Sequence, residues 1–570
     1  MGKLSEKLGE YRAAIDKTIH SKHDSRHEQV APKTAAPPSS QQVMATGDRP
    51  SRIHSPTPLE VLRYRYHHGA NLGSIFVLEK WLHPSMFPAN APNDQSSELA
   101  AVTASMQQIG LEATRAKFEE HWKNAVSTSD FDWLVNVARC KLSSPYLLQR
   151  HTLTSNHQGT SIRLPIGYFT LGPAYCTHTP FAHVAQVYAN AWSAVQTFVF
   201  RARARGIGVL IDLHALPGGA NTGEHSGTNS GKAELWNNHE NLKLAQRCLS
   251  FLAQETKNMD GVIGLQLCNE AIWDAPGMYG WYDSTTATIG SIDQTIPVYI
   301  SDAWNLPTAL SYTNAKNSLR AGSANPIIVD THLYWAFTDE DKAKSPQQIT
   351  GEVGSKLGEL DGKDGNVSEH GAAQIIVGEY SCVLTDDSWA KGGSADRAQL
   401  VRDFGQAQSE RYQRRAGGSF FWTYKMDWMD GGEWGFVAQT NSGAIKPPLN
   451  LTLGHDDVLT RVASAKEQQD RRCSAATQSH SDYWNRTAPG QQFEHWRYEG
   501  GWNVGFRDAM AFFGMRAEGR LPGPGGDKIG CLDVWVKKRI VESGMAGSFV
   551  WEFEQGFRQG VKEFYEAVGV

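Results

Sequence analysis

The 570-residue sequence predicts an α/β protein: a (β/α)8 TIM barrel with a disordered N-terminal segment and a mainly helical C-terminal extension. Eight apolar or β-branched runs follow one another from about residue 66, separated by segments long enough for helices. Continuous apolar runs indicate strands covered on both faces, and their alternation with helices indicates a parallel sheet. Eight such units, with no Gly-rich phosphate loop after the first run, favour a closed barrel over an open sheet.

The predicted strands are the only long series of apolar runs in the sequence. They are centred on residues 70–75, 161–166, 208–214, 262–267, 297–301, 326–332, 374–379 and 418–422. Between them, residues 182–205, 238–257 and 396–415 have the apolar periodicity of helices.

We expect residues 1–60 to form a mostly disordered N-terminal segment. Residues 21–57 are rich in Ser, Gln, Pro, His and Ala, so they cannot bury much apolar surface. Before them, Leu4, Leu8, Tyr11, Ile15 and Ile19 have the three-four spacing of a short amphipathic helix. The barrel, as catalytic domain, is expected to span residues 61–450.

Residues 451–570 are expected to form a helical extension with a weak two-fold repeat. Residues 496–505 resemble residues 551–560, at a spacing of 55 residues. Two copies are too few for a solenoid, so we predict a small helical unit packed on the barrel. An aromatic sugar-binding surface is the alternative.

Composition excludes several classes of partner. A formal net charge of −5 gives no reason to expect a nucleic acid. The seven cysteines lie far apart without a CxxC pair, so neither a zinc knuckle nor a redox motif is predicted. The N-terminus lacks the apolar core of a signal peptide, and no stretch is long enough for a transmembrane segment. We therefore expect a cytoplasmic protein, with non-classical secretion as the alternative.

The predicted site residues all lie at or just after the ends of the predicted strands. The strands of a barrel deliver their last residues to one rim, where the active sites of this architecture lie. Each of these residues alone is more simply explained as an ion-pair partner or a core residue, but the whole set indicates chemistry. The set is Arg163, His214, Asn269, Glu270, His332, Tyr334, Glu379 and Trp422.

Glu270 and Glu379 each end an apolar run, where a buried carboxylate is costly unless it is paired or exposed at the strand mouth. A retaining glycosidase needs one protonated and one ionised carboxyl group, about 5 Å apart, on either side of the sugar bond. We predict that Glu270 is the acid and then the base, and that Glu379 is the nucleophile. Arg163 near Glu379 would favour its ionised form.

Three further side chains have predicted contacts with the sugar or the nucleophile. Asn269 would hydrogen-bond the sugar 2-hydroxyl, a contact that strengthens in the transition state. Tyr334 would donate to an oxygen of Glu379, and Trp422 would form the floor under the sugar ring.

Six segments together resemble glycoside hydrolase family 5, nearest to the fungal exo-β-1,3-glucanases. They are residues 71–82, 118–122, 163–168, 212–221, 330–334 and 421–425. The resemblance covers roughly residues 61–445 and all eight site positions. It implies a (β/α)8 fold and retaining hydrolysis of β-glycosides by Glu270 and Glu379, with no metal or other cofactor.

The sequence departs from the family pattern in ways that widen the range of expected substrates. Ala271 follows Glu270 where the family usually has Pro. The expected lack of a secretion signal, the long C-terminal extension and the disordered start also depart from the simple family pattern. We predict hydrolysis of β-1,3-glucan or other β-glucosides. The alternatives are an intracellular glycolipid β-glucosidase, acting on steryl glucoside or glucosylceramide with peripheral membrane contact, and a non-catalytic sugar-binding protein.

Overall fold

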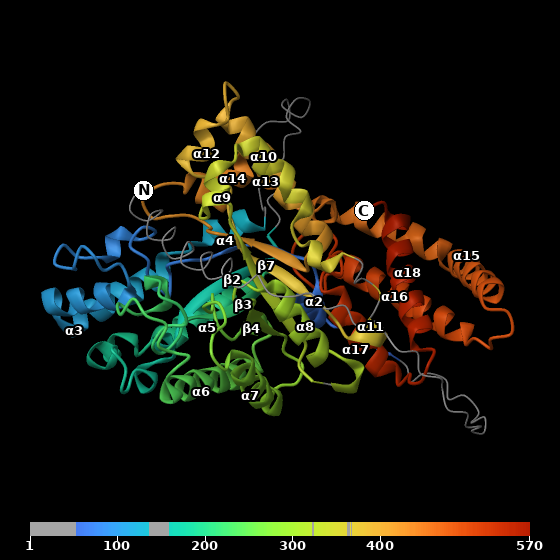
Figure 1. The fold of residues 1–570 in the computed structure, drawn as a ribbon, viewed down its shortest axis with the longest axis horizontal. Coiled ribbons are helices and arrows are strands. Elements are labelled where there is room, and N and C mark those ends of the chain that lie inside the picture. Colours follow the sequence, from blue (N-terminus) through green and yellow to red (C-terminus); the bar gives the residue numbers. More distant parts are fainter. Residues whose placement is uncertain (1–52, 136–158, 322–323, 362–364, 366) are drawn as a thin grey trace, which may run out of the picture.

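The computed structural model describes residues 53–135, 159–321, 324–361, 365 and 367–570. Eight parallel strands close into a barrel in chain order, and β1 pairs with both β2 and β8 (Figure 1). They are β1 (His67–Asn71), β2 (Ser161–Gly167), β3 (Gly208–Ala215), β4 (Val262–Gln266), β5 (Val298–Ser301), β6 (Ile327–Leu333), β7 (Ile375–Tyr380) and β8 (Gly418–Phe421). The predicted (β/α)8 fold is confirmed. The predicted N-terminal helix and most of the expected disordered segment lie outside the described residues.

The first strand lies earlier in the chain than predicted. It spans His67–Asn71, whereas the apolar run suggested residues 70–75. His67 and His68 are buried, and burial lowers their pKa values to about 3 and about 4 respectively, so both imidazoles are neutral at pH 7. His67 Nδ1 lies 2.8 Å from Ser161 Oγ on the neighbouring strand. Two histidines therefore occupy strand positions that an apolar pattern does not reveal.

Helices cover the outside of the barrel (Figure 1). The long ones are α3 (Glu98–Asn124), α5 (Ala191–Arg203), α6 (His239–Thr256), α7 (Met278–Ile292), α8 (Leu306–Lys316) and α13 (Arg397–Arg415). The short ones are α2 (Pro58–Tyr64), α4 (Thr128–Leu134), α9 (Asp339–Ala343), α10 (Pro346–Glu352), α11 (Val367–His370), α12 (Asp386–Ala390) and α14 (Phe436–Asn441). Local sequence explains their ends. At α6, for example, the Asn238 side chain accepts hydrogen bonds from the backbone N–H groups of Glu240 and Asn241.

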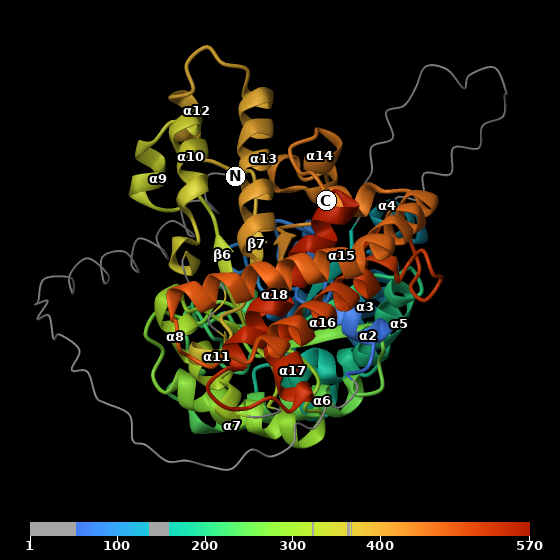
Figure 2. The same cartoon turned by 90° about the vertical axis from the view of Figure 1, so that its right-hand side faces the viewer.

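Four helices form the C-terminal extension, seen to one side of the barrel in Figure 1 and facing the viewer in Figure 2. They are α15 (His455–Thr487), α16 (His495–Gly514), α17 (Leu532–Ser543) and α18 (Val550–Val568). Their apolar faces share one core with side chains of the barrel strands, such as Leu210, Ile263 and Phe420. The extension is thus packed on the barrel, as predicted.

Polar contacts place the extension at the N-terminal end of the barrel. The backbone N–H of Tyr66, next to β1, donates to the Lys528 carbonyl at 2.9 Å, and the N–H of Gly530 donates to the Tyr64 carbonyl at 2.9 Å. The fully buried Arg65 guanidinium lies 3.4 Å from Asp527 of the extension. Because catalytic rims lie at the other end of such barrels, the extension lies away from the expected active site.

The sequence repeat corresponds to a close pair of helices, α16 and α18. Gly501 and Gly505 of α16 lie against the backbone carbonyls of Phe553 and Phe557, and Gly556 and Gly560 of α18 lie against those of Tyr498 and Trp502. A Cβ atom on any of these glycines would lie 2.0–2.1 Å from the facing oxygen. The repeated glycines therefore let the two backbones approach each other. Among the described residues, no helix combines the length and the apolarity needed to cross a membrane.

Candidate active site

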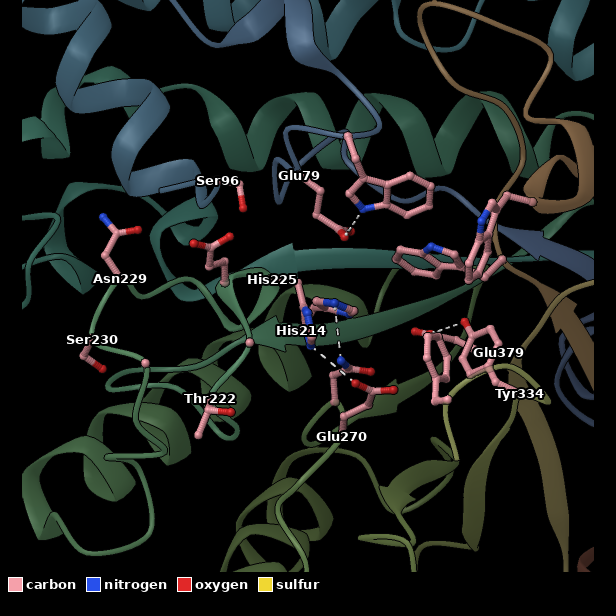
Figure 3. Close-up of a pocket in the computed structure, with 18 of the residues that line it drawn as sticks. Glu79, Ser96, His214, Thr222, His225, Asn229, Ser230, Glu270, Tyr334 and Glu379 are labelled. Carbon is pink, nitrogen blue, oxygen red and sulfur yellow. Dashed lines mark hydrogen bonds and ion pairs between the residues drawn. The ribbon is translucent and has the colours of Figure 1, made fainter. Parts of the chain in front are cut away.

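A cavity of about 390 Å³ opens at the C-terminal ends of the strands, and the predicted residues His214, Glu270, Tyr334 and Glu379 surround it (Figure 3). Six of them line it directly: His214, Asn269, Glu270, Tyr334, Glu379 and Trp422. The other two, Arg163 and His332, are buried beside it and contact its carboxylates. The structure thus brings together all eight residues that the sequence indicated.

Both oxygens of Glu379 are held by hydrogen bonds. Arg163 Nη1 donates to Oε1 at 2.9 Å, and the Tyr334 hydroxyl donates to Oε2 at 2.8 Å. Glu379 lies on β7, Arg163 on β2 and Tyr334 just after β6, so three parts of the barrel fix one carboxylate. This confirms the predicted proximity of Arg163 and Tyr334 to Glu379. The guanidinium places a full positive charge against this carboxylate.

Arg163 is the centre of a buried polar network. Its guanidinium donates to Gln266 Oε1 at 2.9 Å, Asn71 Oδ1 at 2.9 Å and Asn269 Oδ1 at 2.7 Å, besides Glu379. Burial alone would lower its pKa, but the carboxylates of Asp212, Asp330 and Glu379 together raise the pKa of Arg163 above its ordinary value. Arg163 is therefore a permanent cation whose position is fixed on every side.

The two carboxylates face each other across His332. His332 Nδ1 lies 2.8 Å from Glu270 Oε1 and 3.4 Å from Glu379 Oε2. One oxygen of each glutamate and a ring nitrogen of His332 all lie within 4.8 Å of one another. The other ring nitrogen, Nε2, lies 3.2 Å from Asp330 Oδ2, which fixes the orientation of the ring. The predicted close pair of carboxylates is present.

A second imidazole contacts Glu270 from a loop. His225 Nε2 lies 3.3 Å from Glu270 Oε2, and the side chains of both residues remain slightly exposed to the cavity. Sequence reasoning missed His225, because it lies on a loop after β3 that has no strand pattern. The only sequence signal for His225 was that it lies shortly after His214, which is near the end of β3.

The two imidazoles set the protonation of Glu270. Burial acts to raise the pKa of this carboxyl, but the hydrogen bonds and charges of His225 and His332 outweigh it and hold the pKa well below its ordinary value. Conversely, burial would lower the pKa of His225, but Glu270 raises it to about 9, and the carboxylates of Glu379 and Asp330 raise the pKa of His332 above 6.5. These shifts favour the ionised form of Glu270 and the protonated forms of His225 and His332.

The other walls of the cavity offer aromatic faces and further carboxylates, among them Glu79. His214 stacks on Trp422 with ring centroids 5.9 Å apart, and Asn269 Nδ2 lies 3.3 Å from His214 Nε2. Trp81 Nε1 donates to Glu79 Oε2 at 2.9 Å, and burial raises the pKa of Glu79. Glu79 and Trp81 were not predicted, because they lie in the loop after β1. Aromatic faces with interspersed acceptors suit sugar rings and their hydroxyls.

The loop that holds Glu270 has a strained backbone. Glu270 has a φ of 42°, in the left-handed region that side chains other than Gly seldom adopt. The N–H of the next residue, Ala271, donates to Ser301 Oγ at 3.2 Å. Proline, which the family pattern has at this position, lacks that N–H. The departure at Ala271 thus adds an anchor for the loop.

Comparison with known proteins decides the family. The chain is 30% identical over 499 residues to glucan 1,3-β-glucosidase 3 of Schizosaccharomyces pombe, covering 86% of this chain and 94% of that protein. The chain belongs to the fungal glucan 1,3-β-glucosidases, within glycoside hydrolase family 5. It is also 27% identical over 419 residues to a glucan 1,3-β-glucosidase of Blumeria graminis, covering 67% of this chain and 87% of that protein.

The extension has its own counterpart among glucan 1,3-β-glucosidases. Residues 465–568 match the family model described as glucan 1,3-beta-glucosidase 3 C-terminal domain. The crystal structure of AoRut shares the fold, with a TM-score of 0.50 at 16% identity, covering 67% of this chain and 98% of that chain. The protein is thus an O-glycosyl hydrolase that cleaves β-glycosides.

Proposed function

We propose that this protein hydrolyses β-glucosidic bonds with retention of anomeric configuration, with Glu379 as nucleophile and Glu270 as acid and base. The observation that carries the proposal is the approach of the two carboxylates, whose oxygens lie within 4.8 Å across an open cavity. Retaining glycosidases hold their carboxyl groups about 5 Å apart, whereas inverting enzymes keep them roughly 6.5–9.5 Å apart to admit a water.

In the first step, an oxygen of Glu379 bonds to the anomeric carbon while the bond to the leaving oxygen breaks. Glu270 gives that oxygen a proton, so an alcohol departs and a glycosyl ester remains on Glu379. In the second step, Glu270 takes a proton from water, the water oxygen bonds to the anomeric carbon, and the Glu379 carboxylate is released. Arg163 and Tyr334 hold both oxygens of Glu379, so it needs little reorganisation to attack.

The proton for the first step comes from the imidazoles that contact Glu270. A carboxyl with a lowered pKa is a poor reservoir for a proton, whereas the raised pKa values of His225 and His332 favour their protonated forms. Both rings lie within 3.3 Å of Glu270, so a proton reaches its oxygens along an existing contact. We propose that these three residues titrate as one acid, which delivers its proton through Glu270.

The proposed substrates are β-1,3-glucan and small β-glucosides. The names of the relatives support β-1,3-glucan as a substrate. The aromatic walls formed by Trp81, Trp422 and Trp434 support binding of a sugar chain. One observation favours the glycolipid alternative: Trp428, 52% exposed, donates its indole N–H to the carbonyl of Trp81 beside the cavity. Such an exposed ring would suit an apolar aglycone.

Product stereochemistry tests the proposal. Proton NMR during hydrolysis of laminari-oligosaccharides or an aryl β-glucoside should show β-glucose first, followed by slow mutarotation. Initial release of α-glucose would contradict the retaining mechanism. The same assay with steryl glucoside and glucosylceramide separates the substrates: strong activity on these lipids beside weak activity on the oligosaccharides would favour the glycolipid alternative.

A further inference from the structure

Three metal-ligating side chains meet inside the helical extension, far from the catalytic rim. His480 comes from α15, His495 from the start of α16 and Glu552 from the first turn of α18. His480 Nε2 lies 3.0 Å and His495 Nδ1 lies 2.9 Å from the same oxygen, Oε2 of Glu552. These three atoms all lie within 4.8 Å of one another.

Glu552 is unlike the other buried carboxylates of the extension. Asp508 pairs with Arg539 at 2.7 Å, Asp527 with Arg516 at 2.8 Å, and Glu554 with Arg558 at 3.0 Å. In the part of the chain that the structure describes, Glu552 has no arginine or lysine within 4.0 Å, although its side chain is fully buried. A buried carboxylate is costly without a compensating cation, and at Glu552 that charge comes either from a protonated imidazole of His480 or His495 or from a metal ion bound between the three side chains.

The remaining contacts of the cluster orient one carboxylate oxygen towards the imidazoles. Glu552 Oε1 accepts a hydrogen bond from the backbone N–H of Glu494 at 2.8 Å, which leaves Oε2 facing both rings. The His480 ring is stacked on Tyr498 with centroids 3.9 Å apart, so its direction is fixed as well. Only His495 is partly exposed, with 21% of its side chain accessible, and it offers a route for a small ion.

We propose that His480, His495 and Glu552 bind a divalent transition-metal ion, zinc in the first instance. Two imidazoles and one carboxylate, with a water as fourth ligand, form one of the known ligand sets of zinc. Ligand atoms about 2.0–2.1 Å from a tetrahedral zinc lie roughly 3.3 Å apart. The distances of 2.9 and 3.0 Å in this cluster reach that value through shifts of a few tenths of an ångström. Imidazole nitrogens disfavour Mg²⁺ and Ca²⁺, which prefer oxygen ligands.

The proposed ion would fasten three helices at one end of the extension. Its ligands are separated by 15 and 57 residues in sequence, which explains why no metal motif is visible there. Because the cluster is remote from the cavity of the active site, zinc bound there would stabilise the extension and leave turnover unaffected.

The test uses the full chain, stripped with EDTA and then titrated with ZnSO4. Calorimetry and elemental analysis should show one zinc per chain, and zinc should raise the Tm by at least about 2 °C. Cobalt in place of zinc should give the visible absorption of a tetrahedral site. Glycoside hydrolysis by the stripped enzyme, below its Tm, should match that of the loaded enzyme.

Two variants show whether zinc binds at this cluster. His495→Gln, at the partly exposed position, should weaken zinc binding at least about 100-fold and abolish the Tm shift. His455→Gln, at the exposed start of α15, is the control and should bind zinc normally. Absence of zinc binding by the full chain, or unchanged binding by His495→Gln, would overturn the proposal. Binding that a glucoside inhibitor displaces would place the ion at Glu270, His332 and Glu379 instead, and would also overturn it.

Discussion

At Glu270, two imidazoles change the chemistry that a carboxylate at a strand end would have alone. The sequence predicted Glu270 as the protonated carboxyl of the pair, whereas in the structure His225 and His332 lower the pKa of Glu270 and their own pKa values are raised. Apparent pKa values of such a cluster belong to the group and not to one residue. The alkaline limb of the pH–rate profile should therefore report the loss of a proton from this cluster.

Replacement of His225 tests this assignment. In His225→Gln, the proton held up to about pH 9 is lost, so the alkaline limb of kcat/KM should move to lower pH by at least about one unit. At pH 7, kcat should fall about 10-fold for alkyl glucosides and much less for glucosides with an activated leaving group, because the latter need little protonation. KM should change little.

A matched control separates a local from a general effect of losing an imidazole. His370→Gln changes an exposed histidine of α11, and its pH profile should equal that of the parent enzyme. An unaltered alkaline limb in His225→Gln would show that His225 plays no part in proton delivery.

The pH dependence of folding stability gives a second test of the raised pKa of His225. Because the folded pKa of about 9 exceeds the ordinary 6.5, the contribution of His225 is full below pH 6.5 and is lost as pH rises through 9.

Seven of the eight predicted site residues could be found because each lies near or just after a strand end, and the barrel brings strand ends together; Arg163 is the third residue of β2 and points into the same network from within the barrel. His225, Glu79 and Trp81 could not be found in this way, since they lie on loops whose course depends on tertiary contacts. Asp212 and Asp330 were missed as well: they lie within strand runs, and only the closed barrel shows that they surround Arg163.

At the scale of elements, α16 and α18 show how a weak repeat encodes a contact. The repeat was visible in the sequence, but the close packing of the two helices was not. The partner of each glycine is a backbone carbonyl on the other helix, which the sequence alone does not identify. Likewise, the extent of β1 was wrong by three residues at its start, because the buried His67 and His68 have no apolar signature.

Adding a methyl group at this helix pair should destabilise the protein. A Cβ on Gly556 would lie 2.0 Å from the Tyr498 carbonyl oxygen, so Gly556→Ala must push α16 and α18 apart. We expect urea or thermal unfolding to show a loss of about 1–3 kcal/mol, despite the better helix propensity of Ala.

Gly500→Ala in α16 is the matched control. Its nearest neighbour is a methionine terminal carbon 4.0 Å away, so it should be neutral or stabilise the protein by up to about 1 kcal/mol. Equal stability changes in the two variants would contradict the close-contact explanation of the repeat.

In the whole molecule, the catalytic residues and the contacts with the C-terminal extension lie at opposite ends of the barrel. The catalytic residues gather where the strands end, while Arg65, Asp527 and the segment 528–531 join the extension to the end where the strands begin. The fold class and the helical nature of the extension could be predicted from apolar periodicity. The place where the extension docks could not, because Arg65 and Asp527 are separated by 462 residues and nothing local links them.

The central claim is that Glu379 forms a covalent bond with the sugar while Glu270 faces it. The most direct measurement is mass spectrometry of the enzyme after incubation with an activated 2-deoxy-2-fluoro-β-glucoside, whose ester intermediate hydrolyses slowly. The account predicts one added fluoroglucosyl group per chain, on the peptide that contains Glu379, with loss of activity in step. Labelling of Glu270 or of another residue, or inhibition without any mass increase, would contradict it.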